Sequence, residues 1–442
     1  MVANPYLHVP TLLAVVAFHS ASRYDPAKHK REPGGMLDDS RLMMRVSLVT
    51  FVSLSVLGVS SCQRTSTLVG AVMCQGLGRL APSSQPDEWT FRGLDPHVRP
   101  RVRPGSYASA THGVRFVGLE TLGSHRYWLD GAETNGIMYT CAGGHIDLAH
   151  VRKAADWTGY LAAVTLDRLR SGQTAFQFKL LEPSRYSVAL TYPKDWDSLP
   201  ATERESVARH VSRQLGQHLA YTAMTWHEIL TWFGFRPKRY KSEFQSAFSW
   251  EDGYSNLLGT CVAAEALRNQ DRVFSDAVTI ALQRRIESLG AQPAAAARQA
   301  SEAVRGDWYA KWWFFTVIRR RNCDIGLDDG RITPCLVSSL PACEGAQGSP
   351  LAVPTLDGLT PYGFSATVTI EPRVWEANKI LRALYGDCKP TTRRLDPSIH
   401  FAPLIDYIKQ DASNRRHLNT NEPDLNRPSG FCRSPEQGFT QQ

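Results

Sequence analysis

The sequence predicts an α+β fold that has a predominantly helical central region, short strands and one β-hairpin. Three observations lead to this prediction. Apolar residues recur every three or four positions in several long stretches between residues 147 and 305, as they do in amphipathic helices. Short runs rich in β-branched and aromatic residues lie on both sides of these stretches. Residues 175–193 contain two alternating runs around a Glu-Pro-Ser turn, which is typical of a hairpin.

The elements can be placed in chain order. Short strands are predicted at 114–117, 126–128 and 136–140. Asp147 is a residue type that caps helices, so the first long helix is placed from 147 to 170. The remaining predictions are hairpin strands at 176–180 and 186–192, helices at 202–233, 253–269, 274–289 and 293–305, a strand-like run at 308–317, and helices at 374–385 and 400–411.

Residues 43–62 have the pattern of a bacterial lipoprotein signal. Arg45 precedes about thirteen mostly apolar residues, and the small residues Ser60 and Ser61 precede Cys62. We therefore expect removal of the signal and lipidation of Cys62. An alternative is a short buried helix or membrane anchor, but a run of thirteen is shorter than the ~20 residues that span a bilayer.

The signal, together with the composition of the remaining chain, divides the sequence into five segments. We expect an over-annotated or disordered N-terminal extension (1–42), the signal (43–62), a tether (63–110), a single globular α+β domain (111–411) and a disordered tail (412–442). Gln63 follows the cysteine, which by similarity to Gram-negative sorting favours the outer membrane. The protein is thus expected in the cell envelope, at the periplasmic face of the outer membrane, held to the membrane through its lipid anchor.

Composition and charge exclude some classes of function. The formal net charge is +8, and 43% of the residues are apolar, which is ordinary for a globular protein. The basic residues are scattered, so we expect no nucleic-acid partner. The eight cysteines after Cys62 form no CxxC pair, which argues against a thiolate zinc site. An oxidising compartment would permit disulfides, and we expect them in the loop-rich region that contains Cys323, Cys335, Cys343 and Cys388.

The densest group of polar residues follows a Gly-Gly pair at 143–144. His145 lies in the predicted turn, and Asp147 and His150 share one face of the first helical turn. Imidazole nitrogens and a carboxylate oxygen are zinc ligands, so these residues are candidate metal ligands. Alternatively, Asp147 only caps the helix, His150 only hydrogen-bonds locally and His145 only fills a turn. Arg152 and Asp156 could form an ordinary surface ion pair, and we interpret them as structural residues or as residues that support the site from outside.

His227 and Glu228 lie in the long helix predicted at 202–233. A row of small residues, Gly216, Ala220 and Ala223, leads to His227 at helical spacing, which permits close approach of another element. We therefore predict His227 at a packing interface and treat it as a fourth candidate ligand. A second layer over Glu228 would bury its carboxylate, raise its pKa and suit it to acid–base work; without that layer it is a solvated glutamate.

A third polar group lies at the start of the helix predicted at 253–269. Glu251 and Asp252 are adjacent carboxylates before a Ser-Asn pair, Ser255 and Asn256. They could bind a cation or orient a substrate, with Glu251 as a reserve catalytic base. The structural alternative, which the sequence favours, is that Glu251 and Asp252 cap the helix and stabilise the positive end of its dipole, at the N-terminus.

Three motifs carry a resemblance: GGHIDLAHVRKAADWT, WHEILTWFGF and SWEDGYSNLLG. Together they resemble a family of uncharacterised bacterial exported proteins and lipoproteins, a domain of unknown function, over roughly residues 95–390. The resemblance implies export and a common site for the three segments. It brings no established activity.

The leading hypothesis is a metal-dependent hydrolase of the cell envelope, with a divalent ion, zinc first, held by His145, Asp147, His150 and His227. Glu228 would take the proton from metal-bound water. Two alternatives stay open. Cys141 could be a nucleophile with a nearby histidine as base. The chain could also be a non-enzymatic envelope binding or scaffold lipoprotein whose protein partner or substrate the sequence does not identify.

Overall fold

The computed structural model describes residues 91–101, 103, 115–127, 133–180, 182–236, 244–269, 271–312, 315–372, 375–388, 390 and 392–418. Contacts divide the chain into two units, Met1–Ser66 and Thr67–Gln442, and all described residues belong to the second. The predicted N-terminal extension, the signal with Cys62 and most of the tether lie outside the described residues. No helix in the described part of the chain has the length and hydropathy needed to cross a membrane.

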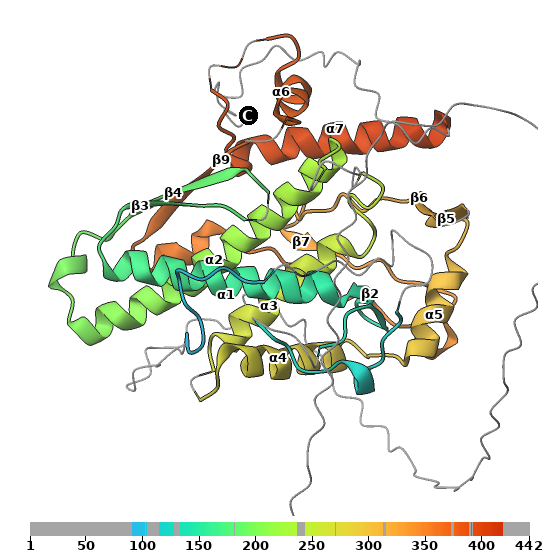
Figure 1. Cartoon of the computed structure of the whole chain (residues 1–442), viewed down its shortest axis with the longest axis horizontal. Helices are drawn as coiled ribbons and strands as arrows, with labels where there is room; N and C mark the ends of the chain where they lie inside the picture. Colours follow the sequence, from blue (N-terminus) through green and yellow to red (C-terminus); the bar gives the residue numbers. More distant parts are fainter. Residues whose placement is uncertain are drawn as a thin grey trace, which may run out of the picture. The chain divides into compact units, whose positions relative to one another are not determined.

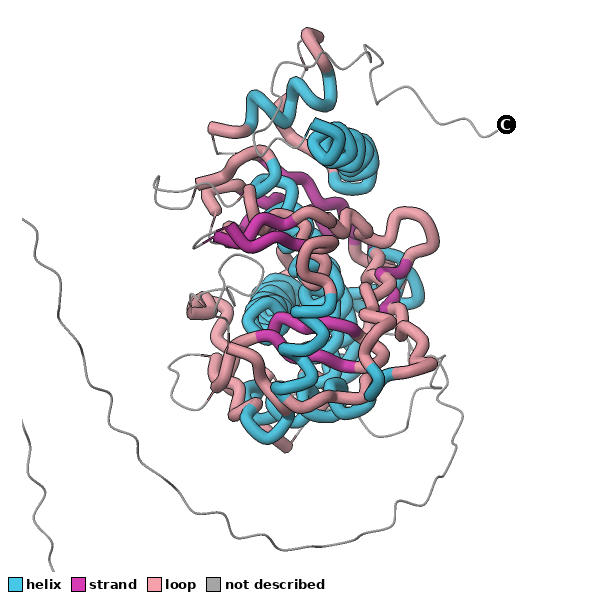
Figure 2. Tube along the Cα trace, turned by 90° about the vertical axis from the view of Figure 1, so that its right-hand side faces the viewer, coloured by secondary structure: helices cyan, strands magenta, loops and turns pink. Residues whose placement is uncertain are grey.

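The fold is α+β, as predicted, with helices in the centre and small antiparallel sheets around them (Figures 1 and 2). The helices are α1 (Leu148–Arg170), α2 (Ala201–Trp232), α3 (Asp252–Ala266), α4 (Phe274–Ser288), α5 (Ala294–Ala303), α6 (Ala377–Tyr385) and α7 (Pro397–Leu418). Short 3₁₀ helices are η1 (Leu119–Thr121), η2 (Trp196–Ser198), η4 (Pro341–Cys343) and η5 (Leu356–Tyr362). Helix α7 continues past residue 412, where the sequence predicted the start of the tail.

The strands pair only in small groups. The hairpin β1 (Ile137–Thr140) and β2 (Gly144–Asp147) precedes α1 directly. The predicted hairpin is confirmed as β3 (Ala175–Phe178) and β4 (Arg185–Thr191), and β9 (Ser365–Glu371) adds a third strand from far along the chain. Two further pairs are β5 (Tyr309–Trp312) with β6 (Phe315–Ile318) and β7 (Arg331–Ile332) with β8 (Leu351–Ala352).

Helix α1 forms the centre of the core: its middle is buried on every side and mostly apolar, with a few buried polar residues such as Asp156 and Thr158. It packs closely against α2 and α3. A Cβ at Gly216 of α2 would lie 2.6 Å from the Ala162 nitrogen, and one at Gly259 of α3 would lie 2.2 Å from the Val151 oxygen. The predicted close approach at the small-residue row of α2 is therefore confirmed, with α1 as the neighbouring element.

A buried ionic network fastens the segment before β1 to α1. Arg103 donates to Asp156 at 2.5 Å and to Glu133 at 2.8 Å, and His125 Nε2 lies 2.8 Å from Asp156. Arg152 Nη1 lies 3.6 Å from Glu133. Arg152 and Asp156 do not form a surface pair: both side chains are buried and each bonds to another part of the chain, which agrees with their interpretation as structural residues.

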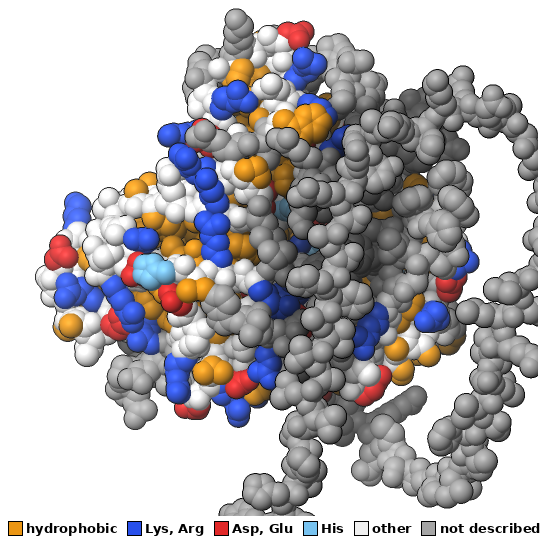
Figure 3. Space-filling view, viewed as in Figure 1, with side chains coloured by type: hydrophobic (Ala, Val, Ile, Leu, Met, Phe, Trp, Pro, Cys, Tyr) orange, Lys and Arg blue, Asp and Glu red, His pale blue; other side chains and the backbone are white. Residues whose placement is uncertain are grey.

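Basic side chains on the face shown in Figure 3 lie in several separate groups, with acidic side chains between them. This distribution matches the scattered positive charge of the sequence.

We predict that Gly259→Ala destabilises the protein by about 3 kcal/mol, because its Cβ would overlap the α1 backbone and force the helices apart. Gly253→Ala, in the same helix, is the matched control: its Cβ would meet nothing closer than the Asp324 oxygen at 3.4 Å. Urea denaturation measures both free energies of unfolding. Equal stability of the two variants would contradict the close crossing of α1 and α3.

We predict that Asp156→Ala costs about 3–5 kcal/mol of stability, because Arg103 and His125 lose a buried partner. Glu205→Ala breaks the exposed pairs with Arg170 and Arg209 and should cost no more than about 1 kcal/mol. Thermal unfolding of the two variants gives the comparison, and a cost for Asp156→Ala as small as that of the control would show that the network is not buried in solution.

Candidate functional site

The hairpin of β1 and β2 positions the first site residue. Gly144 has φ +68°, and a Cβ there would lie 2.2 Å from the Cys335 oxygen, so the predicted sharp turn and close approach are both present. The turn is fastened by a disulfide between Cys141 and Cys343, whose Cα atoms are 5.0 Å apart. Strand β2 ends at Asp147, immediately before α1.

Asp147 caps α1 and also faces His150. Its Oδ1 accepts hydrogen bonds from the backbone nitrogens of Ala149 at 2.8 Å and His150 at 3.2 Å. Its Oδ2 lies 3.0 Å from His150 Nδ1. The capping interpretation is therefore confirmed, and the cap itself orients the second carboxylate oxygen towards the imidazole.

Asp252, the first residue of α3, completes this cluster. Its Oδ1 lies 3.1 Å from His150 Nδ1, and its Oδ2 accepts from the Ser249 nitrogen at 3.3 Å. The Asp147 nitrogen donates to Ser255 Oγ at 3.0 Å, which ties β2 to α3. Ligand atoms of Asp147, His150 and Asp252 all lie within 4.8 Å of one another, so among the described residues these three form a group that could hold a metal ion.

Two more buried carboxylates and one ammonium group surround the cluster. Burial, and then the charge of Asp252, raise the pKa of Glu228. Burial and the charges of Asp252 and Asp147 raise the pKa of Glu251 well above its usual value. The charge of Lys153 opposes these shifts at Glu228 and Asp252. Lys153 and His150 are the basic groups that act on these carboxylates, so acidic groups outnumber basic ones in this buried region.

The pKa of His150 shows the same excess. Burial and the charge of Lys153 lower it, but the carboxylates of Asp147 and Asp252 raise it more, and the net pKa is about 9. In the absence of another cation, the imidazolium is the positive charge that these two carboxylates share.

His145 lies in a different environment from the other candidate ligands. Its ring contacts Tyr139, Trp250 and Trp308 edge-on, with centroids 5.0, 5.8 and 6.3 Å away. Neither ring nitrogen has a hydrogen-bond partner among the described residues. Burial lowers the pKa of His145 to about 3, so the ring is neutral. The structure does not bring His145 into the metal-holding group.

His227 lies at the helix interface that the row of small residues predicted. Its ring contacts Phe235 at 6.2 Å, and burial together with the charges of Lys153 and His150 lowers its pKa to about 3. It is thus near His150 across the contact of α1 and α2, but it is not part of the group of three.

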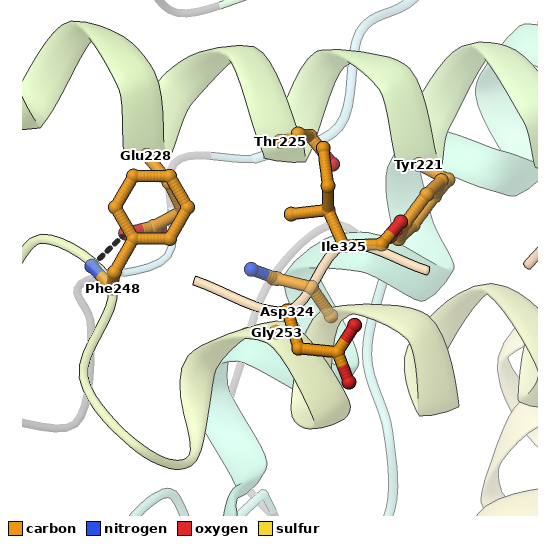
Figure 4. A pocket seen from close by; sticks show the side chains of 8 residues that line it. Tyr221, Thr225, Glu228, Phe248, Gly253, Asp324 and Ile325 are labelled. Carbon is orange, nitrogen blue, oxygen red and sulfur yellow. Dashed lines mark hydrogen bonds between the residues drawn. The ribbon is translucent and has the colours of Figure 1, made fainter. Parts of the chain in front are cut away.

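A small pocket adjoins the cluster, and Figure 4 shows α2 side chains pointing into it towards the start of α3. Its lining residues are Tyr221, Thr225, Glu228, Phe248, Gly253, Asn256, Asp324 and Ile325. Its space of about 260 Å³ includes open solvent, so the pocket is smaller than a typical small-molecule site. Phe248 has φ +52°, and its nitrogen donates to Glu228 Oε2 at 2.9 Å. The second layer that was needed to bury Glu228 is therefore present.

Asp252 and Cys141 have roles in the structure that differ from those the sequence indicated. Asp252 was noted only as one of two adjacent carboxylates that could bind a cation, and the structure makes it the third member of the cluster. Cys141 was a candidate nucleophile, but its sulfur is bonded to Cys343. A thiolate is the nucleophilic form of cysteine, so the disulfide would have to open first.

We predict that metal-free Glu228→Gln is more stable than the wild type at pH 8 by on the order of 2 kcal/mol, and equally stable at pH 4. The pKa of Glu228 rises from 4.5 to about 7 on burial, so ionisation in this pH window favours the unfolded chain. Gln keeps an oxygen for the Phe248 nitrogen. Urea denaturation with a chelator measures the difference, and Glu203→Gln, an exposed position in α2, is the control. A stability gain independent of pH would contradict a buried, ionisable Glu228.

A family model described as a protein of unknown function (DUF4056) matches residues 116–316. No curated protein and no solved structure matches the chain. The matched range includes the cluster of Asp147, His150 and Asp252 together with Glu228 and Glu251. The comparisons thus agree with the expected resemblance to a domain of unknown function, and they assign no activity to it.

Proposed function

We propose that the chain is a metal-dependent hydrolase. One observation carries the proposal: Asp147, His150 and Asp252, from three different elements, converge to within 4.8 Å in a largely buried region. Buried charges in proteins are paired or coordinate metals. A divalent ion would compensate the carboxylates of Asp147 and Asp252 better than the single charge of the His150 imidazolium does.

The donor set fits a first-row divalent ion. An imidazole nitrogen and carboxylate oxygens are ligands of zinc and of similar ions. Binding requires a neutral imidazole, so the ion would displace the proton that His150 now shares with Asp147 and Asp252. Three protein ligands leave a position for water, and a bound ion would make that water acidic enough to react near neutral pH.

Glu228 is the proposed general base. Its carboxylate is buried, interacts electrostatically with Asp252 and His150, and lines the small pocket beside Gly253. One oxygen is held by the Phe248 nitrogen, so the carboxylate has a defined orientation. The pocket has room for about one water molecule.

The proposed location remains the cell envelope, with a lipid anchor at Cys62. The disulfide between Cys141 and Cys343 supports it, because disulfides persist mainly in oxidising compartments. The substrate would then be a component of the envelope.

A second candidate is metal-free acid–base catalysis by His150. The specific observation in its favour is that Nδ1 already lies 3.0 and 3.1 Å from two carboxylate oxygens, which would hold the imidazole in one tautomer and raise its basicity. The two candidates differ in whether a metal or a proton lies between these three side chains.

The test begins with metal content. Protein purified without chelators should contain about one divalent ion per chain, and Asp252→Asn should lose it while remaining folded. Ester, phosphodiester and peptide model substrates then test hydrolysis: activity should disappear on chelation and return with zinc or manganese. Glu228→Gln should keep the ion and lose at least about 100-fold in activity.

Each alternative gives a different result. Hydrolysis that persists after complete removal of metal, and is lost in His150→Ala, would replace the metal proposal by acid–base catalysis. A protein that binds no divalent ion and hydrolyses none of the substrates would overturn both proposals and favour a binding role.

A further inference from the structure

Glu251 is a buried carboxylate with no structural role that explains its position. Its side chain is 1% exposed. It occupies the N-cap of α3 but makes no side-chain capping bond, unlike Asp147 at α1. Neither oxygen has a hydrogen-bond partner among the described residues; Ser249 lies near without the geometry of a bond. Stabilisation of the helix dipole, the role that the sequence favoured for Glu251, does not explain why the carboxylate is buried. Burying a carboxylate without a partner costs free energy.

Glu251 lies beside the cluster in the chain: Asp252 is the next residue, and the charges of Asp252 and Asp147 both act on Glu251. This arrangement brings three carboxylates together near one positive charge, the His150 imidazolium that Asp147 and Asp252 already share, so a bound cation would stabilise it.

We propose that Glu251 is a fourth protein ligand of the ion held by Asp147, His150 and Asp252; this inference rests on the proposed function. Since no hydrogen bond holds the Glu251 carboxylate, turning it towards the ion breaks none. The complete set is then three carboxylates and one imidazole. Glu228, bonded to the Phe248 nitrogen, stays outside it as the base.

Four protein ligands change the expected geometry of the ion. A tetrahedral ion with four protein ligands has no open position, as in structural zinc sites. A catalytic ion with this set must have five or six ligands, and the predominance of oxygen suits manganese or magnesium better than a tetrahedral zinc. The inference therefore specifies an oxygen-rich, expanded coordination shell.

Cobalt(II) is the probe, because its visible absorption is weak in six-coordinate sites and strong in tetrahedral ones. The wild type loaded with Co²⁺ should show weak bands. Glu251→Gln should bind Co²⁺ at least about tenfold more weakly and shift towards the stronger spectrum. The matched control is Glu376→Gln: Glu376 also lies at a helix N-cap, is 0% exposed and has two oxygens without a hydrogen-bond partner among the described residues. Its substitution should change neither affinity nor spectrum.

X-ray absorption on the wild type provides a measurement that does not depend on a variant. We expect five or six oxygen and nitrogen neighbours around Co²⁺, including one imidazole. Unchanged affinity and spectrum in folded Glu251→Gln, or a four-coordinate wild-type ion, would overturn the role of Glu251 and leave the three-ligand site standing. A wild type that binds no Co²⁺, Zn²⁺ or Mn²⁺ would overturn the proposed function as well.

Discussion

Backbone contact between α1 and its two neighbours is the constraint on which the site depends. Gly216 and Gly259 let α2 and α3 approach α1 more closely than any side chain would allow. The crossing at Gly259 lies two helical turns from Asp252, and the crossing at Gly216 lies three turns from His227. Apolar packing therefore holds together the N-termini of α1 and α3 and the C-terminal half of α2. This packing brings the polar residues of the site close to one another.

The same residues stabilise the fold and build the candidate site. Asp147 caps α1 with one oxygen and presents the other to His150. The Glu228 carboxylate accepts from Phe248, whose positive φ places strain beside the pocket. A structural role and a chemical role are thus compatible for Asp147 and Glu228. The hydrogen bonds that one carboxylate oxygen accepts also fix the direction in which the other oxygen points. Asp147 and Glu228 are therefore oriented by the fold before any ligand arrives.

Local patterns in the sequence predicted local structure well. The cap at Asp147, the turn at Gly144, the hairpin of β3 and β4 and the close approach at Gly216 all depend on neighbours in the chain or on helical spacing. Asp252 could not be placed in the same way, since its contact with His150 spans about a hundred residues and exists only because of the crossing of α1 and α3. The family resemblance indicated that the three motifs share one site, but not which side chains meet.

Spacing along the chain did not identify the spatial partners of two groups of residues. A spacing of four residues in a helix is typical of surface ion pairs, which made Arg152 and Asp156 a possible pair. In a helix buried on all sides, however, such residues find partners on neighbouring segments. His145 lies two residues before Asp147 in the same short strand, yet its ring lies among aromatic residues and outside the group of Asp147, His150 and Asp252.

The disulfide between Cys141 and Cys343 has a consequence for the unfolded chain. It joins residues 202 positions apart, and the loop it closes contains α1, α2 and α3 entire. By loop-closure entropy such a cross-link disfavours the unfolded ensemble by about 5 kcal/mol. Backbone bonds from Cys141 to Gly290 and from Ala142 to Leu289 hold the same turn in the folded state. Reduction should therefore lower the free energy of unfolding while leaving the arrangement of the site unchanged.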